Sequence, residues 1–205
     1  MDNYQKTKDD YDIGVKWHFQ KSNSYNWSKQ LEKFVNLLKG KKVLDAGCGT
    51  GRDIKLFLKN NIEVEGIDYS EESIKKCCSL YPNTSFYVGD FRKIDVPNNF
   101  YDGIWSCTSI LNTPKNEIPN LLNEFSRILK PSGIMFISVK QGIGEKVIAD
   151  DYGERLFSFF SEDELKQYIT SAGFKVLYSE IITDESLTGI PSIKPNLICI
   201  YSEKN

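Results

Sequence analysis

The sequence has little of several features that mark specialised proteins. It contains one histidine and five cysteines, an odd number without metal-ligand spacing, so we predict neither a metal site nor a disulfide framework. No apolar run approaches the roughly 20 residues that cross a bilayer, and the N-terminus lacks the apolar stretch of a signal peptide. The formal net charge of −2 gives no basic excess to neutralise phosphates. We therefore expect a cytoplasmic protein with reduced cysteines and no membrane contact, and a nucleic acid partner is disfavoured.

What the sequence does contain is a regular alternation of strand-like and helix-like segments. The 205 residues, 40% of them apolar, suffice for one domain with a hydrophobic core. Their alternation after residue 40 predicts an α/β domain whose parallel sheet is wrapped by helices. Residues 183–196 are too few for a helical crossover, so the last two strands are expected to pair antiparallel. The expected strands are 42–45, 62–68, 85–89, 101–107, 134–139, 174–182 and 197–202.

Two segments fit no regular element. Residues 1–25 are polar with scattered aromatic side chains, and residues 140–160 mix glycines with charged and aromatic residues. Long irregular segments beside a rigid scaffold often provide lids and substrate contacts. Packing of these aromatic rings against the ends of the sheet is an equally good interpretation. We predict a single domain in which residues 1–25 form a lid and residues 26–205 form the core.

A glycine-rich turn between the first strand and the next helix is the most informative motif. Gly47, Gly49 and Gly51 alternate with other residues, and Asp45 stands two positions ahead of them. Such glycines let the backbone lie against a ligand with its N–H groups exposed. A dinucleotide site usually has Gly-x-Gly-x-x-Gly instead. A carboxylate at position 45 would repel a pyrophosphate, but it suits a ligand that carries an ammonium or another cationic group.

Acidic residues also end the next two strands. Asp68 ends the second strand, where a carboxylate can bind a ribose diol. Asp90 and Phe91 end the third strand. The acid can accept a hydrogen bond from an adenine amino group while the aromatic ring lies against the base. These positions, added to the glycine turn, indicate an adenosine-containing ligand.

These motifs, followed in order by Asp102 and the Leu-Lys-Pro-Ser-Gly sequence at 129–133, resemble class I S-adenosylmethionine-dependent methyltransferases over residues 25–205. The resemblance implies a Rossmann-like seven-stranded, mostly parallel sheet with an antiparallel last strand and helices on both faces. It implies S-adenosyl-L-methionine as the cofactor, although Asp102 serves better as a strand-starting residue than as a ligand contact. The cofactor-binding residues that it implies are Asp45, Gly47, Cys48, Gly49, Gly51, Asp68, Tyr69, Asp90, Phe91, Ser106 and Cys107.

The sequence restricts the methyl acceptor mainly through motifs that are missing. Residues 106–109 lack the Asn/Asp-Pro-Pro-aromatic motif of amino methyltransferases, and neither a Pro-Cys nucleophile nor a catechol-type Asp-Asn metal cluster occurs. What remains resembles the bacterial small-molecule methyltransferases, including those linked to tellurite resistance. We therefore expect a small-molecule acceptor and a monomer or homodimer.

Four residues are candidates for the acceptor side. Lys140, at the end of the fifth strand, and Arg155 are expected to bind an anionic acceptor, with solvated surface charges as the competing interpretation. Tyr11, in the lid segment, is a further candidate for acceptor binding. His18 titrates in the range of a general base, but a lone histidine in an aromatic segment is more often structural. A base is needed only if the acceptor must lose a proton.

Other functions fit the sequence less well. An RNA or protein methyltransferase is disfavoured because the sequence has no excess of basic residues and no appended recognition domain. A nicotinamide-dependent oxidoreductase would have to place its pyrophosphate beside Asp45 on an altered glycine spacing. A non-catalytic S-adenosylmethionine-binding module has the same cofactor motifs and stays open.

Overall fold

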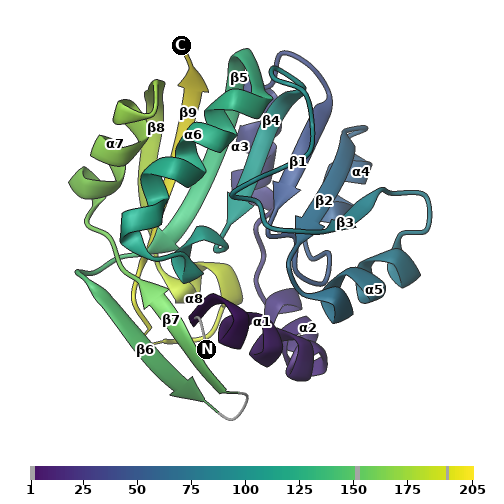
Figure 1. Cartoon of the computed structure of the whole chain (residues 1–205), viewed down its shortest axis with the longest axis vertical. Helices are drawn as coiled ribbons and strands as arrows, with labels where there is room; N and C mark the ends of the chain where they lie inside the picture. The colour runs from purple at the N-terminus through teal and green to yellow at the C-terminus, as the bar shows by residue number, and fades with distance from the viewer. Residues whose placement is uncertain (1–2, 151–152, 193) are drawn as a thin grey trace.

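A seven-stranded sheet forms the centre of the structure, a computed structural model that describes residues 3–150, 153–192 and 194–205. Its strands are Lys42–Ala46 (β1), Glu63–Asp68 (β2), Phe86–Val88 (β3), Tyr101–Cys107 (β4), Leu129–Lys140 (β5), Phe174–Ile182 (β8) and Leu197–Lys204 (β9). They lie in the order β3-β2-β1-β4-β5-β9-β8 (Figure 1). Strands β1 to β5 pair in parallel, whereas β9 is antiparallel to β5 and to β8. The Rossmann-like sheet and the antiparallel last pair are therefore confirmed.

Amphipathic helices cover both faces of this sheet. They are Ser28–Leu37 (α3), Ile54–Lys59 (α4), Glu71–Leu80 (α5), Ile118–Ile128 (α6) and Glu162–Ser171 (α7). Two short 3-10 helices, Ile110–Asn112 (η1) and Lys115–Glu117 (η2), precede α6. Leu121 and Phe125 of α6 are fully buried in one core cluster. On the other side Phe34 of α3 and Phe57 of α4 pack against Trp105 of β4, with ring centroids 5.4 and 5.8 Å from it.

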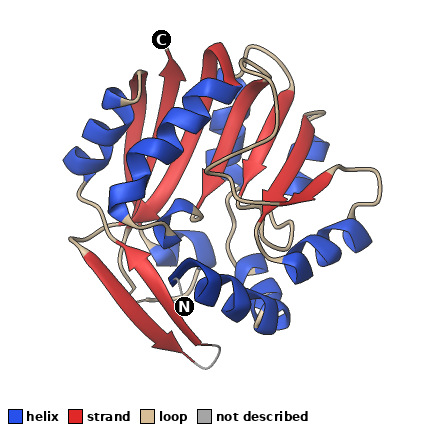
Figure 2. Ribbon diagram, viewed as in Figure 1, coloured by secondary structure: helices blue, strands red, loops and turns tan. Residues whose placement is uncertain are grey.

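A second layer lies beyond the carboxyl ends of the parallel strands. It comprises the N-terminal helices Asn3–Ile13 (α1) and Val15–Asn23 (α2), the antiparallel hairpin Glu145–Asp150 (β6) and Gly153–Ser158 (β7), and the short helix Asp184–Thr188 (α8). Figures 1 and 2 show these elements gathered below the strand ends. Open α/β sheets bind their ligands at this edge.

The expectation that residues 1–25 are irregular is wrong, because most of this segment is helical. Helix α1 has no apolar stripe, so periodicity gave no signal for it. Polar contacts along and beyond the helix stabilise it instead. Lys8 pairs with Asp12 one turn later at 3.0 Å, and Lys6 reaches Glu154 of β7 at 2.5 Å.

The expectation of irregular structure at 140–160 is also wrong, because a hairpin occupies most of it. Its register pairs Val147 with Leu156 and Lys146 with Phe157. Val147 and Ile148 remain exposed, so the strand lacks the alternation that marks a half-buried strand. Asp151 and Tyr152, in the same segment, lie outside the described residues.

Several boundaries also differ from those expected. Strand β5 begins at Leu129 instead of Ile134, with a register shift opposite Tyr101 and Gly103 of β4. Cys78 is exposed, whereas its neighbour Cys77 is buried against Cys48. Across the described residues, every helix is too short or too polar to cross a membrane.

Candidate functional site

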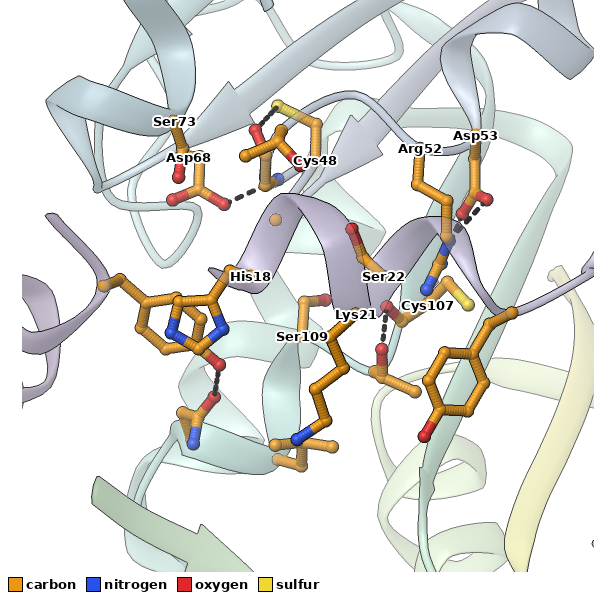
Figure 3. Close-up of a pocket in the computed structure, with 18 of the residues that line it drawn as sticks. His18, Lys21, Ser22, Cys48, Arg52, Asp53, Asp68, Ser73, Cys107 and Ser109 are labelled. Atoms are coloured by element: carbon orange, nitrogen blue, oxygen red, sulfur yellow. Dashed lines mark hydrogen bonds and ion pairs between the residues drawn. The ribbon is translucent and has the colours of Figure 1, made fainter. Parts of the chain in front are cut away.

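One cavity of about 250 Å³ opens at the carboxyl ends of β1, β2, β4 and β5, beneath the N-terminal helices (Figure 3). It brings together residues that the sequence analysis assigned to the cofactor and to the acceptor. Those that line it are Asp45, Gly47, Cys48, Gly49, Asp68, Tyr69, Phe91 and Cys107 from the cofactor set and Tyr11, His18, Lys140 and Arg155 from the acceptor set. Gly51, Asp90 and Ser106 are not among its lining residues.

The glycine turn places bare backbone against the cavity. Gly47, Gly49 and Gly51 have φ angles of 82°, 52° and 83°, which L side chains rarely adopt. The amides of Gly47 and Cys48 donate to the Ile67 carbonyl at 2.8 and 3.1 Å, so the turn is fastened to the end of β2. A Cβ atom at Gly47 would lie 2.3 Å from Cβ of Ser109, whereas one at Gly49 would meet nothing within 4 Å. The surface at Gly49 is therefore open to a ligand.

Asp68 connects this turn to the start of α5. One carboxylate oxygen accepts a hydrogen bond from the Gly49 amide at 2.9 Å, and the other accepts one from the Ser70 amide at 2.9 Å. Burial raises the pKa of Asp68 to about 6, although these backbone hydrogen bonds act in the opposite direction. The side chain therefore has a fixed position and ionises near neutral pH.

Two further buried carboxylates make the floor of the cavity acidic. Asp53 accepts hydrogen bonds from Arg52 Nε at 2.7 Å and from Trp105 Nε1 at 2.8 Å. Asp45 is 3% exposed, and its burial next to Asp53 raises its pKa well above the ordinary range. Three carboxylates thus face one guanidinium at this end. A cationic ligand would offset this excess of negative charge. The three carboxylates therefore fit the ammonium and sulfonium groups of S-adenosylmethionine.

The predicted residues outside the cavity have other contacts. Both carboxylate oxygens of Asp90 accept hydrogen bonds from Arg92 Nε, at 3.0 and 2.8 Å. Ser106 Oγ lies 2.7 Å from Ser109 Oγ, which donates to the Ala46 carbonyl. Ser106 therefore takes part in the hydrogen bonds that connect the end of β4 to the end of β1.

Gly51 and Asp102 likewise have structural surroundings. A side chain at Gly51 would crowd Tyr81 and Cys77 of the α5 region. Asp102 accepts hydrogen bonds from the Lys42 amide and from Lys130 Nζ at the start of β1 and β4. This position agrees with a strand-starting role.

Cationic and aromatic side chains form the opposite wall. Lys140 Nζ lies 3.8 Å from the Phe157 ring centroid, and Arg155 Cζ lies 5.6 Å from the same centroid. Arg155 Cζ also lies 5.1 Å from the Tyr11 ring, which stacks on His18 at 4.4 Å. The four acceptor candidates, which come from α1, α2, β5 and β7, therefore form one continuous group with Phe157.

Helix α1 is joined to the start of α5 through a residue that the sequence analysis did not single out. Asp12 of α1 accepts a hydrogen bond from Ser70 Oγ at 2.6 Å and from the Glu72 amide at 3.2 Å. Ser70 in turn contacts Asp68. No sequence signal marks Asp12, because it is one acid in a polar segment. Arg52 and Asp53 were also missed, although their adjacency to the third glycine was visible.

Comparison with known proteins matches residues 43–133 to a family model described as a methyltransferase domain. A sterol 24-C-methyltransferase of Gibberella zeae is 26% identical over 71% of this chain and 42% of its own length. A phosphoethanolamine N-methyltransferase of Zea mays is 30% identical over 78% of this chain and 33% of its own length. The chain spans less than half the length of these curated relatives.

Solved structures share the fold at lower identity. An S-adenosylmethionine-dependent methyltransferase of Methanosarcina mazei has a TM-score of 0.74 and 19% identity, covering 82% of this chain and 95% of its own. A didemethyltoxoflavin N1-methyltransferase of Burkholderia thailandensis, solved with S-adenosylhomocysteine bound, has a TM-score of 0.72 and 22% identity, covering 87% and 76%. Residues 43–133 thus match a methyltransferase domain in sequence, and the chain as a whole shares the fold of these S-adenosylmethionine-dependent methyltransferases.

Proposed function

We propose that the chain transfers a methyl group from S-adenosylmethionine to a small-molecule acceptor. The observation that carries this proposal is a cavity that combines an acidic, backbone-lined floor with a cationic wall. Its floor suits a cationic adenosyl donor, and its wall leaves room for a second, small ligand. Hydrogen bonds connect the ends of β1, β2 and β4 at the floor, which favours a fixed donor position.

The donor would be held by the chain's own fixed groups. The Gly49 surface and Asp68 would take the ribose portion, and the buried acids Asp45 and Asp53 would favour the positively charged methionine end. Phe91 would lie against the adenine. Asp90 would accept a hydrogen bond from the adenine amino group after its hydrogen bonds with Arg92 break. The bound donor supplies a methyl group on a positively charged sulfur.

The residues then have to align the acceptor and exclude water. The acceptor's lone pair forms the new bond to the methyl carbon while the carbon–sulfur bond breaks, its electron pair staying on sulfur. A neutral acceptor that carries a proton must also release it, whereas an ionised one needs no base. Tyr11, Lys140 and Arg155 are placed to orient the acceptor, and His18 lies within reach of Arg155 at 3.4 Å. Alignment of this kind supplies a large share of the rate in such reactions.

We infer further that the chain belongs among the methyltransferases linked to tellurite resistance and works in the cytoplasm as a monomer or homodimer. The subgroup is supported by the sequence pattern from Ile137 to Lys140 and Arg155 to Phe157, which builds the cationic wall. The cytoplasm is supported by the free cysteines, of which Cys48, Cys77, Cys107 and Cys199 are buried. The arrangement of α1 and α2 over the cavity supports a lid within a single domain.

The proposal is tested by incubating the full chain with S-adenosylmethionine and a panel of thiols, phenols, amines, selenite and tellurite. We expect S-adenosylhomocysteine to accumulate with at least one small acceptor, and not with RNA or a protein substrate. The Asp68→Asn variant should abolish that release. Turnover of RNA or protein alone, or binding of NAD without either adenosyl ligand, would contradict the proposal.

A further inference from the structure

Three cations from distant parts of the chain meet on the acceptor side of the cavity. Lys140 ends β5, Arg155 lies in β7, and Lys21 extends from α2. All three line the cavity together with Phe157. The Phe157 ring contacts both Lys140 and Arg155, so it holds these two charges at one wall.

The ammonium group of Lys140 has no ion-pair partner among the described residues. Within the described ranges, no residue accepts a hydrogen bond from Lys140 Nζ. The charge of Asp184 favours the protonated lysine, but Asp184 already accepts hydrogen bonds from Tyr25 at 2.7 Å and Lys194 at 3.1 Å. Burial, followed by the charges of Lys21 and Arg155, lowers the pKa of Lys140 to about 8. Gathering like charges in a partly buried wall is unfavourable unless an anion joins them.

The cations are also separated from the acids of the floor. Figure 3 shows Asp68 and Cys48 on one side of the cavity and Arg52 with Asp53 on another, while Lys21 extends from α2 away from both. Asp53 accepts two hydrogen bonds from Arg52. Asp53 and Asp68 therefore lie apart from Lys21 in the cavity.

We propose that Lys140, Arg155 and Lys21 form a subsite that binds the methyl acceptor through an oxyanion group, such as a carboxylate or a phosphate. This inference rests on the proposed function, because it assigns the second ligand of the same cavity. Arg155 presents the planar fork that matches an oxyanion, and the two lysines add point charges around it. Tyr11 and His18 are positioning residues, since their stacked rings pack against the Arg155 guanidinium.

The experiment uses small probes that carry only the proposed oxyanion group, so it does not depend on the structure of the rest of the acceptor. The full chain is first saturated with S-adenosylhomocysteine and then titrated with acetate, acetamide and inorganic phosphate. Binding is followed by the chemical shifts of backbone amides around the cavity. We expect acetate or phosphate to bind and the neutral, isosteric acetamide not to bind. The stronger of the two anions indicates whether a carboxylate or a phosphate is preferred.

Charge-removing variants locate the binding. Lys140→Met and Lys21→Met should each weaken anion binding about tenfold, in line with the loss of one charge-assisted hydrogen bond. Lys55→Met, on the exposed face of α4, is the matched control and should bind anions like the parent chain. Lys21→Met keeps the test open if the change at the partly buried Lys140 harms folding.

The outcomes separate this inference from the proposed function. Failure of S-adenosylhomocysteine itself to bind would overturn the proposed function. Donor binding with equal shifts for acetate and acetamide, or anion binding unaffected by both variants, would overturn only the oxyanion subsite. The donor's own carboxylate is the rival occupant. If Lys140→Met weakens S-adenosylhomocysteine but not 5′-methylthioadenosine, which lacks the amino-acid part, the cations serve the donor and the inference is wrong.

Discussion

The two ends of the cavity differ in charge and in the way the chain builds them. The end that we propose for the donor comes from residues 45–91, a nearly continuous stretch in which strands end beside one another, and acidic residues line it. The end that we propose for the acceptor combines α1 and α2 with the end of β5, β7 and residues 194–197, which are far apart in sequence, and Lys21, Lys140, Arg155 and Lys194 line it. A ligand site built on adjoining strand ends is fixed by the sheet. A site assembled from a lid and a hairpin depends on contacts between them.

We expect the largest effect from removing the carboxylate charge of Asp68, in the end of the cavity proposed for the donor. Asp68→Asn should weaken S-adenosylhomocysteine binding about 100-fold, because hydrogen bonds to charged groups contribute about 1.5–3 kcal/mol each. Calorimetric titration measures the change. Asp163→Asn, on the exposed surface of α7, is the control and should bind normally. Equal affinities for the two variants would contradict the role of Asp68.

The backbone of the donor end can be tested separately from its charge. Gly47→Ala and Gly173→Ala both place a side chain at positive φ, 82° and 86°, which costs about 1–2 kcal/mol. Only the Cβ at position 47 meets an obstacle, Ser109 Cβ at 2.3 Å. We expect Gly47→Ala to lose donor binding and more unfolding free energy than Gly173→Ala, as measured by denaturant titration. Similar losses in both variants would argue against a tightly fitted turn.

The two ends should respond to pH in opposite directions. Asp68, with a pKa of about 6, becomes protonated as pH falls below that value, so donor affinity should decline there. Lys140, with a pKa of about 8, loses its charge as pH rises, so anion affinity should decline there. Titrations of each ligand between pH 5 and pH 9 (roughly one unit beyond each pKa) test this. In Lys140→Met the upper decline should disappear while the lower one stays.

Loss of the contacts that hold α1 in place is expected to have a smaller effect on ligand binding. Asp12→Ala removes the hydrogen bonds from Ser70 Oγ and the Glu72 amide, so α1 should open more often. We expect S-adenosylhomocysteine to dissociate several-fold faster, within the range of about 1–3 kcal/mol that such groups contribute. Stopped-flow displacement measures the rate. Asp9→Ala, which removes only a contact with Gln5 on the same helix, should leave it unchanged.

The smallest effect concerns stability at the acceptor end. The pKa of Lys140 is lower in the folded chain than the ordinary 10.5, so its charge opposes folding below about pH 8, and stability recovers as pH rises from 8 toward 10.5. Lys140→Met should therefore raise the melting temperature at pH 7 by a few degrees, where about 1 kcal/mol corresponds to 2–4 °C for a chain of this size. Lys55→Met should not change it. A lower melting temperature for Lys140→Met would show that this charge is compensated.

The same contrast explains how much could be predicted from the sequence. The order of strands and the glycine turn follow from local patterns, because a strand end and its following residues already determine where Asp45 and Asp68 lie. Helix α1 and the hairpin β6–β7 could not be predicted from periodicity, since α1 has no apolar stripe and exposed apolar residues interrupt the alternation in β6. Lys140 and Arg155 were proposed from their types, but their shared contact with Phe157 depends on the folded hairpin. The hydrogen bond from Arg92 to Asp90 depends on the conformation of the loop after β3, which the sequence pattern does not determine.

A crystal structure of the chain with S-adenosylhomocysteine and the preferred small anion would test the opposition of the two ends most directly. We expect the ribose hydroxyls on Asp68, the amino-acid nitrogen and sulfur over the acidic floor, and the anion against Lys140, Arg155 and Lys21. The contradicting result is an adenosyl ligand whose own carboxylate occupies those three cations, because the cavity would then have one binding end instead of two.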